Sequence, residues 1–167
     1  MLSYIGIHIG YTVMRVKTRR SFNMISNAGF LISQIKSVGG RVFEKLLSRE
    51  GINEFNGAQG KILYVLWQKD GISIAELSKS VGLAKTTLTS MLDRMEASGL
   101  IVRTHSSKDR REILIFLTQK AGSLSSKYEE VSARMTDVYF KGFEEDEVKE
   151  VENFLNRILE NVKEELE

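Results

Sequence analysis

Apolar residues recur at steps of three and four through most of this chain, the spacing that places side chains on one face of an α-helix. A first long helix is predicted from 25 to 47 on the apolar positions Ala28, Leu31, Ile32, Ile35, Val38, Val42 and Leu46. A second helix is predicted around 61–67, and Asp70-Gly71 closes it. From 118 onward the pattern is again helical, and its last segment alternates steps of three and four as a helix packed on another helix does. The positions of that seam are Val148, Val151, Leu155, Ile158 and Val162.

Two shorter helices separated by a tight turn are predicted between 73 and 97. Ser73 and Glu76 have the S-x-x-E spacing of a capping box, which starts a helix. Gly82 follows the apolar stripe of that helix and accepts the left-handed backbone of a sharp turn. A second stripe then begins, made of Leu88, Met91, Leu92 and Met95. This arrangement is typical of a helix-turn-helix.

The opposite face of the second of these helices carries small hydroxyl-bearing side chains. Thr86, Ser90, Asp93 and Ala97 point away from the apolar stripe, and Thr89 and Arg94 flank it. Such a face can approach base edges closely, and Ser and Thr hydrogen-bond to any base. An ordinary amphipathic surface helix would show the same polarity, so the neighbouring segments decide between the two interpretations.

A short strand at 100–102 and a β-branched strand at 112–117 are predicted next, joined by a polar turn. That turn, 105–111, contains three cations and one anion. A basic hairpin tip beside DNA contacts phosphates or enters the minor groove, whereas most isolated charge clusters are simply solvated. The order helix, turn, helix, strand, basic hairpin, strand favours the first interpretation and predicts a winged helix-turn-helix that binds DNA.

The block ISIAELSKSVGLAKTTLTSMLDRMEASGLIV at 72–102, the wing at 109–111 and Leu117-Thr118 resemble the MarR family of transcriptional regulators, over roughly residue 25 to the C-terminus. The resemblance implies a mainly α fold: a winged helix-turn-helix with a three-helix core and a two-stranded β-wing, between long N- and C-terminal dimerisation helices. The implied domain is 25–167, with dimerisation helices at 25–50 and 118–167 and the DNA-binding region at 56–117. The alternative is that the end helices pack within one chain.

The resemblance also implies roles on DNA for residues of the second helix and the wing. Arg111 would enter the minor groove with Asp109 holding its guanidinium, and Arg110 would touch phosphate. Thr86, Thr87, Thr89 and Ser90 would face bases, while Lys85 and Arg94 would contact phosphate. The full predicted set is Lys85, Thr86, Thr87, Thr89, Ser90, Arg94, Lys108, Asp109, Arg110 and Arg111.

Two departures from the family pattern limit what can be carried over. Many relatives have arginine where Ser90 stands, so base preference at that position is not transferable. The family's L-T-x-x-G stretch is one residue longer here, at 117–122, which affects only where the following helix starts.

Charge and absent residue types narrow the function further. The formal charge is only +2, and the segment from Lys141 to the end has four cations against ten carboxylates, which should keep it away from phosphate. The chain has no cysteine and two histidines, which excludes a thiol switch and the His-rich zinc sites of metal-sensing relatives. No catalytic constellation is present, so no enzyme activity, cofactor or metal is predicted.

The resemblance implies a small aromatic or amphipathic anion as effector, bound where the dimerisation helices meet the DNA-binding region. Phe43, Tyr64 and Trp67 are apolar candidates for its pocket, but core packing is the more common role of such residues, and no effector site is assigned.

The first 24 residues are unlike the rest. Apolar residues up to Met14 are followed by a basic stretch at 15–20. The apolar run is shorter than the roughly 20 residues of a bilayer span, and its cations follow rather than precede it, unlike those of a signal peptide. A disordered tail, an upstream extension with the start at Met14 or Met24, and a basic DNA-binding arm remain open. No membrane association is expected, and the cytoplasm is the expected location.

These observations predict a homodimeric, sequence-specific regulator that binds double-stranded DNA at a pseudo-palindromic operator, a repressor released by a small-molecule effector. The alternative is a winged-helix module that uses the same surface for a protein partner.

Overall fold

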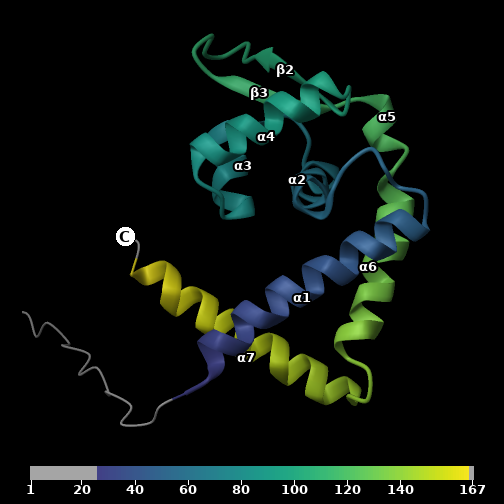
Figure 1. Cartoon of the computed structure of the whole chain (residues 1–167). Coiled ribbons are helices and arrows are strands. Elements are labelled where there is room, and N and C mark those ends of the chain that lie inside the picture. The colour runs from purple at the N-terminus through teal and green to yellow at the C-terminus, as the bar shows by residue number, and fades with distance from the viewer. Residues whose placement is uncertain (1–25, 166–167) are drawn as a thin grey trace, which may run out of the picture.

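A computed structural model of the chain describes residues 26–165 and shows a mainly α fold with one small sheet (Figure 1). The predicted tail at 1–24 lies outside these residues. The elements in chain order are α1 (Ala28–Arg49), α2 (Gly57–Gln68), β1 (Ile72–Ser73), α3 (Ile74–Val81), α4 (Lys85–Ala97), β2 (Ile101–His105), β3 (Ile113–Leu117), α5 (Gln119–Gly122), α6 (Ser125–Tyr139) and α7 (Glu145–Glu164). The predicted mainly α, winged helix-turn-helix fold is confirmed.

The molecule has two parts, which Figure 1 shows one above the other. The upper part, called here the reading head, holds α2, α3, α4 and the sheet. The lower part, called here the helical lobe, holds α1, α6 and α7. The short α5 connects β3 of the reading head to α6.

The sheet is antiparallel and has the strand order β1-β3-β2. The wing hairpin β2–β3 runs from the pair Ile101–Leu117 to the pair His105–Ile113. The two-residue β1, which the sequence pattern did not predict, adds a third strand through Ile72 paired with Ile115. Through this pairing, β1 holds the start of α3 beside β3 of the wing hairpin.

Ser73 is the N-cap of α3, as predicted, but only one of the two hydrogen bonds of the predicted capping box forms. The Ser73 hydroxyl accepts from the backbone N–H of Glu76 at 3.2 Å. The Glu76 carboxylate does not return the bond, because it pairs with Lys69 at 2.7 Å. Gly82 ends α3 in the left-handed region with φ +66°, as predicted, so a side chain there would strain the turn.

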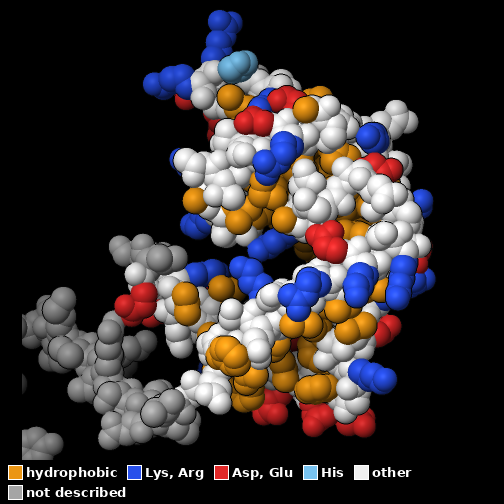
Figure 2. Space-filling view, in the orientation of Figure 1, with side chains coloured by type: hydrophobic (Ala, Val, Ile, Leu, Met, Phe, Trp, Pro, Cys, Tyr) orange, Lys and Arg blue, Asp and Glu red, His pale blue; other side chains and the backbone are white. Residues whose placement is uncertain are grey.

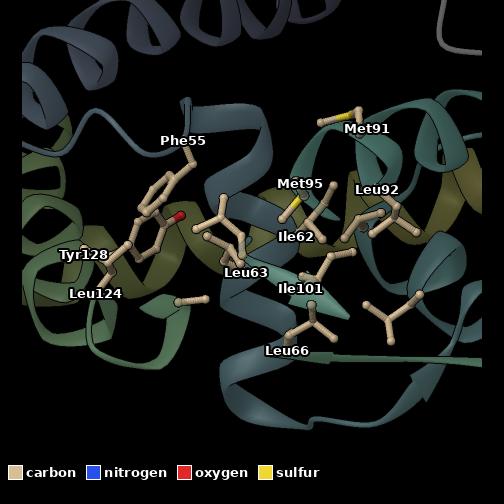
Figure 3. Packing of buried hydrophobic residues seen from close by; sticks show 14 of the residues in the cluster. Phe55, Ile62, Leu63, Leu66, Met91, Leu92, Met95, Ile101, Leu124 and Tyr128 are labelled. Atoms are coloured by element: carbon tan, nitrogen blue, oxygen red, sulfur yellow. The ribbon is translucent and has the colours of Figure 1, made fainter. Parts of the chain in front are cut away.

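The core lies mainly in the reading head, where α2, α4 and β2 meet (Figure 3). Leu88, Leu92 and Met95 of α4 are fully buried, together with Ile62 and Leu66 of α2. Hydrophobic burial at this density is what fixes the rotation of α4 and therefore which of its residues face outward.

An aromatic cluster joins the reading head to the helical lobe. The buried ring of Tyr128 on α6 lies 5.1 Å from that of Trp67 and 5.7 Å from that of Phe43, centroid to centroid. Trp67 donates its indole N–H to the carbonyl of Ala121 at 3.1 Å. Phe43 and Trp67 are partly buried against the core, whereas Tyr64 is about half exposed.

The helical lobe leaves many apolar side chains in solvent. No residue of α7 is buried. Orange side chains gather over this lower part in Figure 2. The exposed large apolar residues of α1 and α7 are Phe30, Leu31, Ile32, Ile35, Val38, Phe154, Leu155, Ile158, Leu159 and Val162.

Candidate nucleic-acid interface

The outward face of α4 is the first element of the candidate interface. All six predicted α4 residues are exposed: Lys85, Thr86, Thr87, Thr89, Ser90 and Arg94. The stripe beneath them is buried, so the predicted orientation of the helix is confirmed.

Hydrogen bonds within α4 divide the hydroxyls of this face into two groups. Thr89 donates to the carbonyl of Lys85 at 2.8 Å, and Arg94 donates to Ser90 at 3.4 Å. The hydroxyls of Thr86 and Thr87 form no hydrogen bond within the part of the chain that the structure describes. They are therefore the most available donors and acceptors on the helix.

The start of α4 suits an anion. Its N-cap residue, Ala84, provides no side-chain cap. The first N–H groups of the helix therefore lack an internal partner, and the positive end of the helix dipole lies here. A DNA phosphate could accept hydrogen bonds from these N–H groups and would be attracted by the positive end of the dipole, with Lys85 beside it.

The wing holds the second element, a clasp between Asp109 and Arg111. The carboxylate accepts from the backbone N–H of Arg111 at 2.9 Å and from its Nε at 3.3 Å. A third bond joins Nη2 to Oδ2 at 3.4 Å, and the Arg111 side chain remains 92% exposed. The backbone N–H of Arg111, and then its side chain, lower the pKa of Asp109 below its ordinary value. The guanidinium thus projects into solvent in an orientation set by its neighbour.

Backbone bonds close the wing tip behind this clasp. Ser106 donates its N–H to the carbonyl of Glu112, and Glu112 donates to that of Asp109, both at 2.9 Å. The exposed His105 donates its Nδ1–H to the carbonyl of Arg110 at 2.8 Å. Lys108 and Arg110 are exposed on the same tip, so the structure brings all four predicted wing residues together.

One residue between the two elements was not among the predicted site residues. Arg103 of β2 lies 2.7 Å from Asp93 and 3.0 Å from Glu96, both carboxylates on α4. The predicted strand ended at residue 102, whereas the observed β2 runs on to His105 and so includes Arg103.

A cavity of about 670 Å³ lies among α1, α2 and α6, where the two parts of the molecule face each other. Figure 2 shows Lys and Arg side chains gathered along this boundary. The lining includes Lys36, Arg41 and Lys61 together with the rings of Phe43 and Tyr128. Burial raises the pKa of the Tyr128 hydroxyl, so the ring stays neutral at physiological pH.

Within the described residues, no cluster of His, Asp and Glu has the arrangement of a metal site. The same part of the chain contains no helix long and apolar enough to cross a bilayer.

An exposed helix held beside a clasped, basic wing defines a protein of the winged helix-turn-helix class. A MarR family model matches residues 55–113, which cover the reading head from the start of α2 to the start of β3. The chain belongs to the MarR family, whose members are transcriptional regulators rather than enzymes.

Two curated relatives are similar over this region. The HTH-type transcriptional regulator TtmR of Methylorubrum extorquens (strain PA1) is 38% identical over 88 residues, which are 53% of this chain and 44% of TtmR. The organic hydroperoxide resistance transcriptional regulator of Bacillus subtilis (strain 168) is 30% identical over 100 residues, which are 60% of this chain and 67% of that protein. The chain thus spans less than half the length of the first and two thirds of the second.

Solved structures extend the similarity beyond the reading head. A MarR transcriptional regulator from Methanosarcina mazei Go1 superposes with a TM-score of 0.73 at 25% identity, covering 82% of this chain and 96% of that one. A mutant of E. coli MarR complexed with operator DNA superposes with a TM-score of 0.72 at 26% identity, covering 78% and 92%.

Proposed function

We propose that this protein is a sequence-specific regulator of transcription that binds double-stranded operator DNA as a homodimer and acts as a repressor. The observation that carries the proposal is the pairing of two exposed elements on one reading head: the hydroxyl face of α4 and the clasped Arg111 of the wing. A helix of this kind fits the major groove, and an arginine on a hairpin fits the adjacent minor groove.

The predicted residues then divide by the part of DNA they meet. Thr86, Thr87, Thr89 and Ser90 face base edges, and Lys85 and Arg94 contact phosphates beside them. On the wing, Arg111 enters the minor groove while Lys108 and Arg110 meet its phosphates.

Two copies of the chain would cover the exposed apolar faces of α1 and α7, which agrees with their role as dimerisation helices. Large apolar side chains exposed together along two helices are typical of an interaction site. A two-fold dimer of reading heads would read a pseudo-palindromic operator with half-sites about one helical turn apart. Residues 56–117 are then the DNA-binding region, and α1, α6 and α7 form the dimerisation region.

The cavity among α1, α2 and α6 is the proposed place of a small aromatic or amphipathic anionic effector. Its cations, Lys36, Arg41 and Lys61, suit a carboxylate or phenolate, and Phe43 and Tyr128 suit an apolar ring. Lys61 also donates to the carbonyl of Val81, the last residue of α3, at 2.8 Å. A ligand that draws Lys61 away would disturb the turn before α4, so the free and bound forms would differ in their fit to DNA. Thiol oxidation is excluded as the switch because the sequence has no cysteine.

The test starts by selecting duplexes from a random library with the wild-type protein. We expect enrichment of an inverted repeat. Binding should weaken steeply as salt rises, and each neutralised phosphate should add about 0.9 to the slope of log affinity against log salt concentration. In gel-shift titrations Arg111→Ala should weaken binding to the selected duplex by about 10- to 100-fold.

The matched control is Arg134→Met, which removes an arginine paired with Glu50 at the junction of α1 and α6, outside the reading head. It should leave DNA affinity unchanged. If no sequence is enriched and binding to DNA is insensitive to salt, the reading head serves a protein partner instead.

A further inference from the structure

Arg103 lies between the two elements of the proposed interface, where it contacts Asp93, Glu96 and the backbone of Thr89 on α4. It lies on β2, at the base of the wing, and its side chain is only 22% exposed. Its Nη1 pairs with Asp93 at 2.7 Å and with Glu96 at 3.0 Å, both on α4.

Two further bonds extend this connection to the backbone of both elements. The Nη2 of Arg103 donates to the main-chain carbonyl of Thr89 on α4 at 3.4 Å. The backbone N–H of Arg103 donates to the Glu96 carboxylate at 3.2 Å. The strand is thus joined to α4 at residues 89, 93 and 96, which span two turns of the helix.

This arrangement is a poor source of stability. Among the described residues the Nε of Arg103 is buried without a hydrogen-bond partner, which carries a desolvation cost. Partly buried ion pairs contribute little net free energy, because the attraction between the charges is offset by the loss of their hydration. A planar guanidinium that reaches two carboxylates and a carbonyl does, however, restrict the relative position of the two elements strongly.

We propose that Arg103 is a positioning residue: it sets the distance and angle between the recognition helix and the wing, so that α4 and Arg111 engage one duplex together. The proposal rests on the proposed DNA-binding function. It also assigns Asp93 and Glu96 a role, since their carboxylates would otherwise lie unpaired close to DNA phosphates.

The first test is a double-mutant cycle on the selected duplex. Arg103→Met should weaken binding about tenfold in the wild-type background and less than about twofold when Arg111 is already Ala, because the minor-groove contact that Arg103 positions is then already lost. Equal losses in both backgrounds would overturn the proposal, since a direct DNA contact or general destabilisation by Arg103→Met adds to the loss of Arg111. Arg103→Lys should recover only part of the affinity, because an ammonium cannot form the planar fork.

The second test uses the sign of an electrostatic effect. Glu96 is at the exposed end of α4, where alanine favours the helix, so Glu96→Ala should fold. Removing a carboxylate near DNA should tighten binding if only charge matters. If Glu96 helps Arg103 position the wing, Glu96→Ala should instead bind DNA more weakly than the wild type. Tighter binding by Glu96→Ala would contradict the positioning role.

A third measurement needs no DNA. Amide hydrogen exchange of residues 101–117 should be faster in Arg103→Met than in the wild type, whereas Arg134→Met should leave it unchanged. Failure of the wild-type protein to select any duplex would refute the proposed function alone, because the exchange result stands without DNA. Unchanged exchange in Arg103→Met, with wild-type DNA binding intact, would refute the positioning role alone.

Discussion

The reading head and the helical lobe bury their apolar residues to very different extents. In the reading head the apolar stripe of α4 lies in the core of the same chain, with α3 and β2 packed against the helix, and Leu88, Leu92 and Met95 are fully buried. In the helical lobe α7 also has an apolar stripe, of which Val148 and Val151 are partly buried and no residue is fully buried. The first region is complete in one chain, whereas the second has a face that only another surface can cover. The same helical periodicity therefore accompanies a buried core in one region and an exposed apolar face in the other.

The largest expected effect comes from placing a charge on the open face. Ile158→Glu on α7 should convert the proposed dimer to a monomer, because a carboxylate buried between two apolar helices would be unpaired. Operator affinity should fall on the order of 100-fold or more, since each half-site would then bind alone. Sedimentation velocity and gel-shift titration would measure the two effects.

The matched control for that variant is Asn153→Glu, which adds the same charge on the opposite side of α7. At about 100° per residue, Asn153 faces away from the apolar seam that contains Ile158. It should remain dimeric. A dimeric Ile158→Glu protein would show that the chain uses another interface.

The next expected effect is on stability and comes from truncating the closed core. Leu92→Ala should lower the free energy of unfolding by about 2–5 kcal/mol, because a fully buried leucine leaves a cavity. In the monomeric Ile158→Glu background this loss should persist, whereas Leu155→Ala on the open face should cost little. Urea denaturation followed by circular dichroism would measure both, and equal losses would contradict the difference between the two regions.

The two regions also differ at glycines where helices pack closely, Gly60 in the reading head and Gly39 in the helical lobe. A Cβ on Gly60 of α2 would lie 2.7 Å from the ring of Tyr128, which the core holds in place. Gly60→Ala should therefore destabilise the protein by about 1–3 kcal/mol through overpacking. A Cβ on Gly39 of α1 would meet the hydroxyl of the exposed Tyr139, which can swing away. Gly39→Ala should be close to neutral in the same thermal unfolding experiment, and a larger loss there than at Gly60 would contradict the comparison.

The smallest expected effect concerns pH and the wing. The folded pKa of Asp109 is lowered, so the carboxylate contributes stability above its unfolded pKa of about 3.9, and this contribution is lost as pH falls through the folded value. Between pH 5 and 8 the clasp with Arg111 should stay closed. An NMR titration of the Asp109 carboxyl should give a pKa below about 3.9, and a pKa at or above that value would show that the clasp is open in solution.

Periodicity and turn chemistry were enough to predict the long helices, the two strands of the wing, the buried stripe of α4 and the turn at Gly82. They worked because each of these features depends on residues close in sequence. The sequence did not predict β1, because a two-residue strand has no periodicity of its own and forms only when β3 lies beside it. Arg103 was missed for a related reason, since the value of its charge depends on how the wing folds back on α4.

The hydroxyl face of α4 has a consequence for the set of sites that the protein can recognise. If α4 reads bases as proposed, a hydroxyl can donate to one base and accept from another, so exchanging a base pair opposite Thr86 or Thr87 would change the partner without leaving a charge unpaired. Mismatches there should cost closer to 1 than to 3 kcal/mol. On the proposed function, such a protein would tolerate sequence drift in its operators and could control several promoters whose sites differ by a few base pairs.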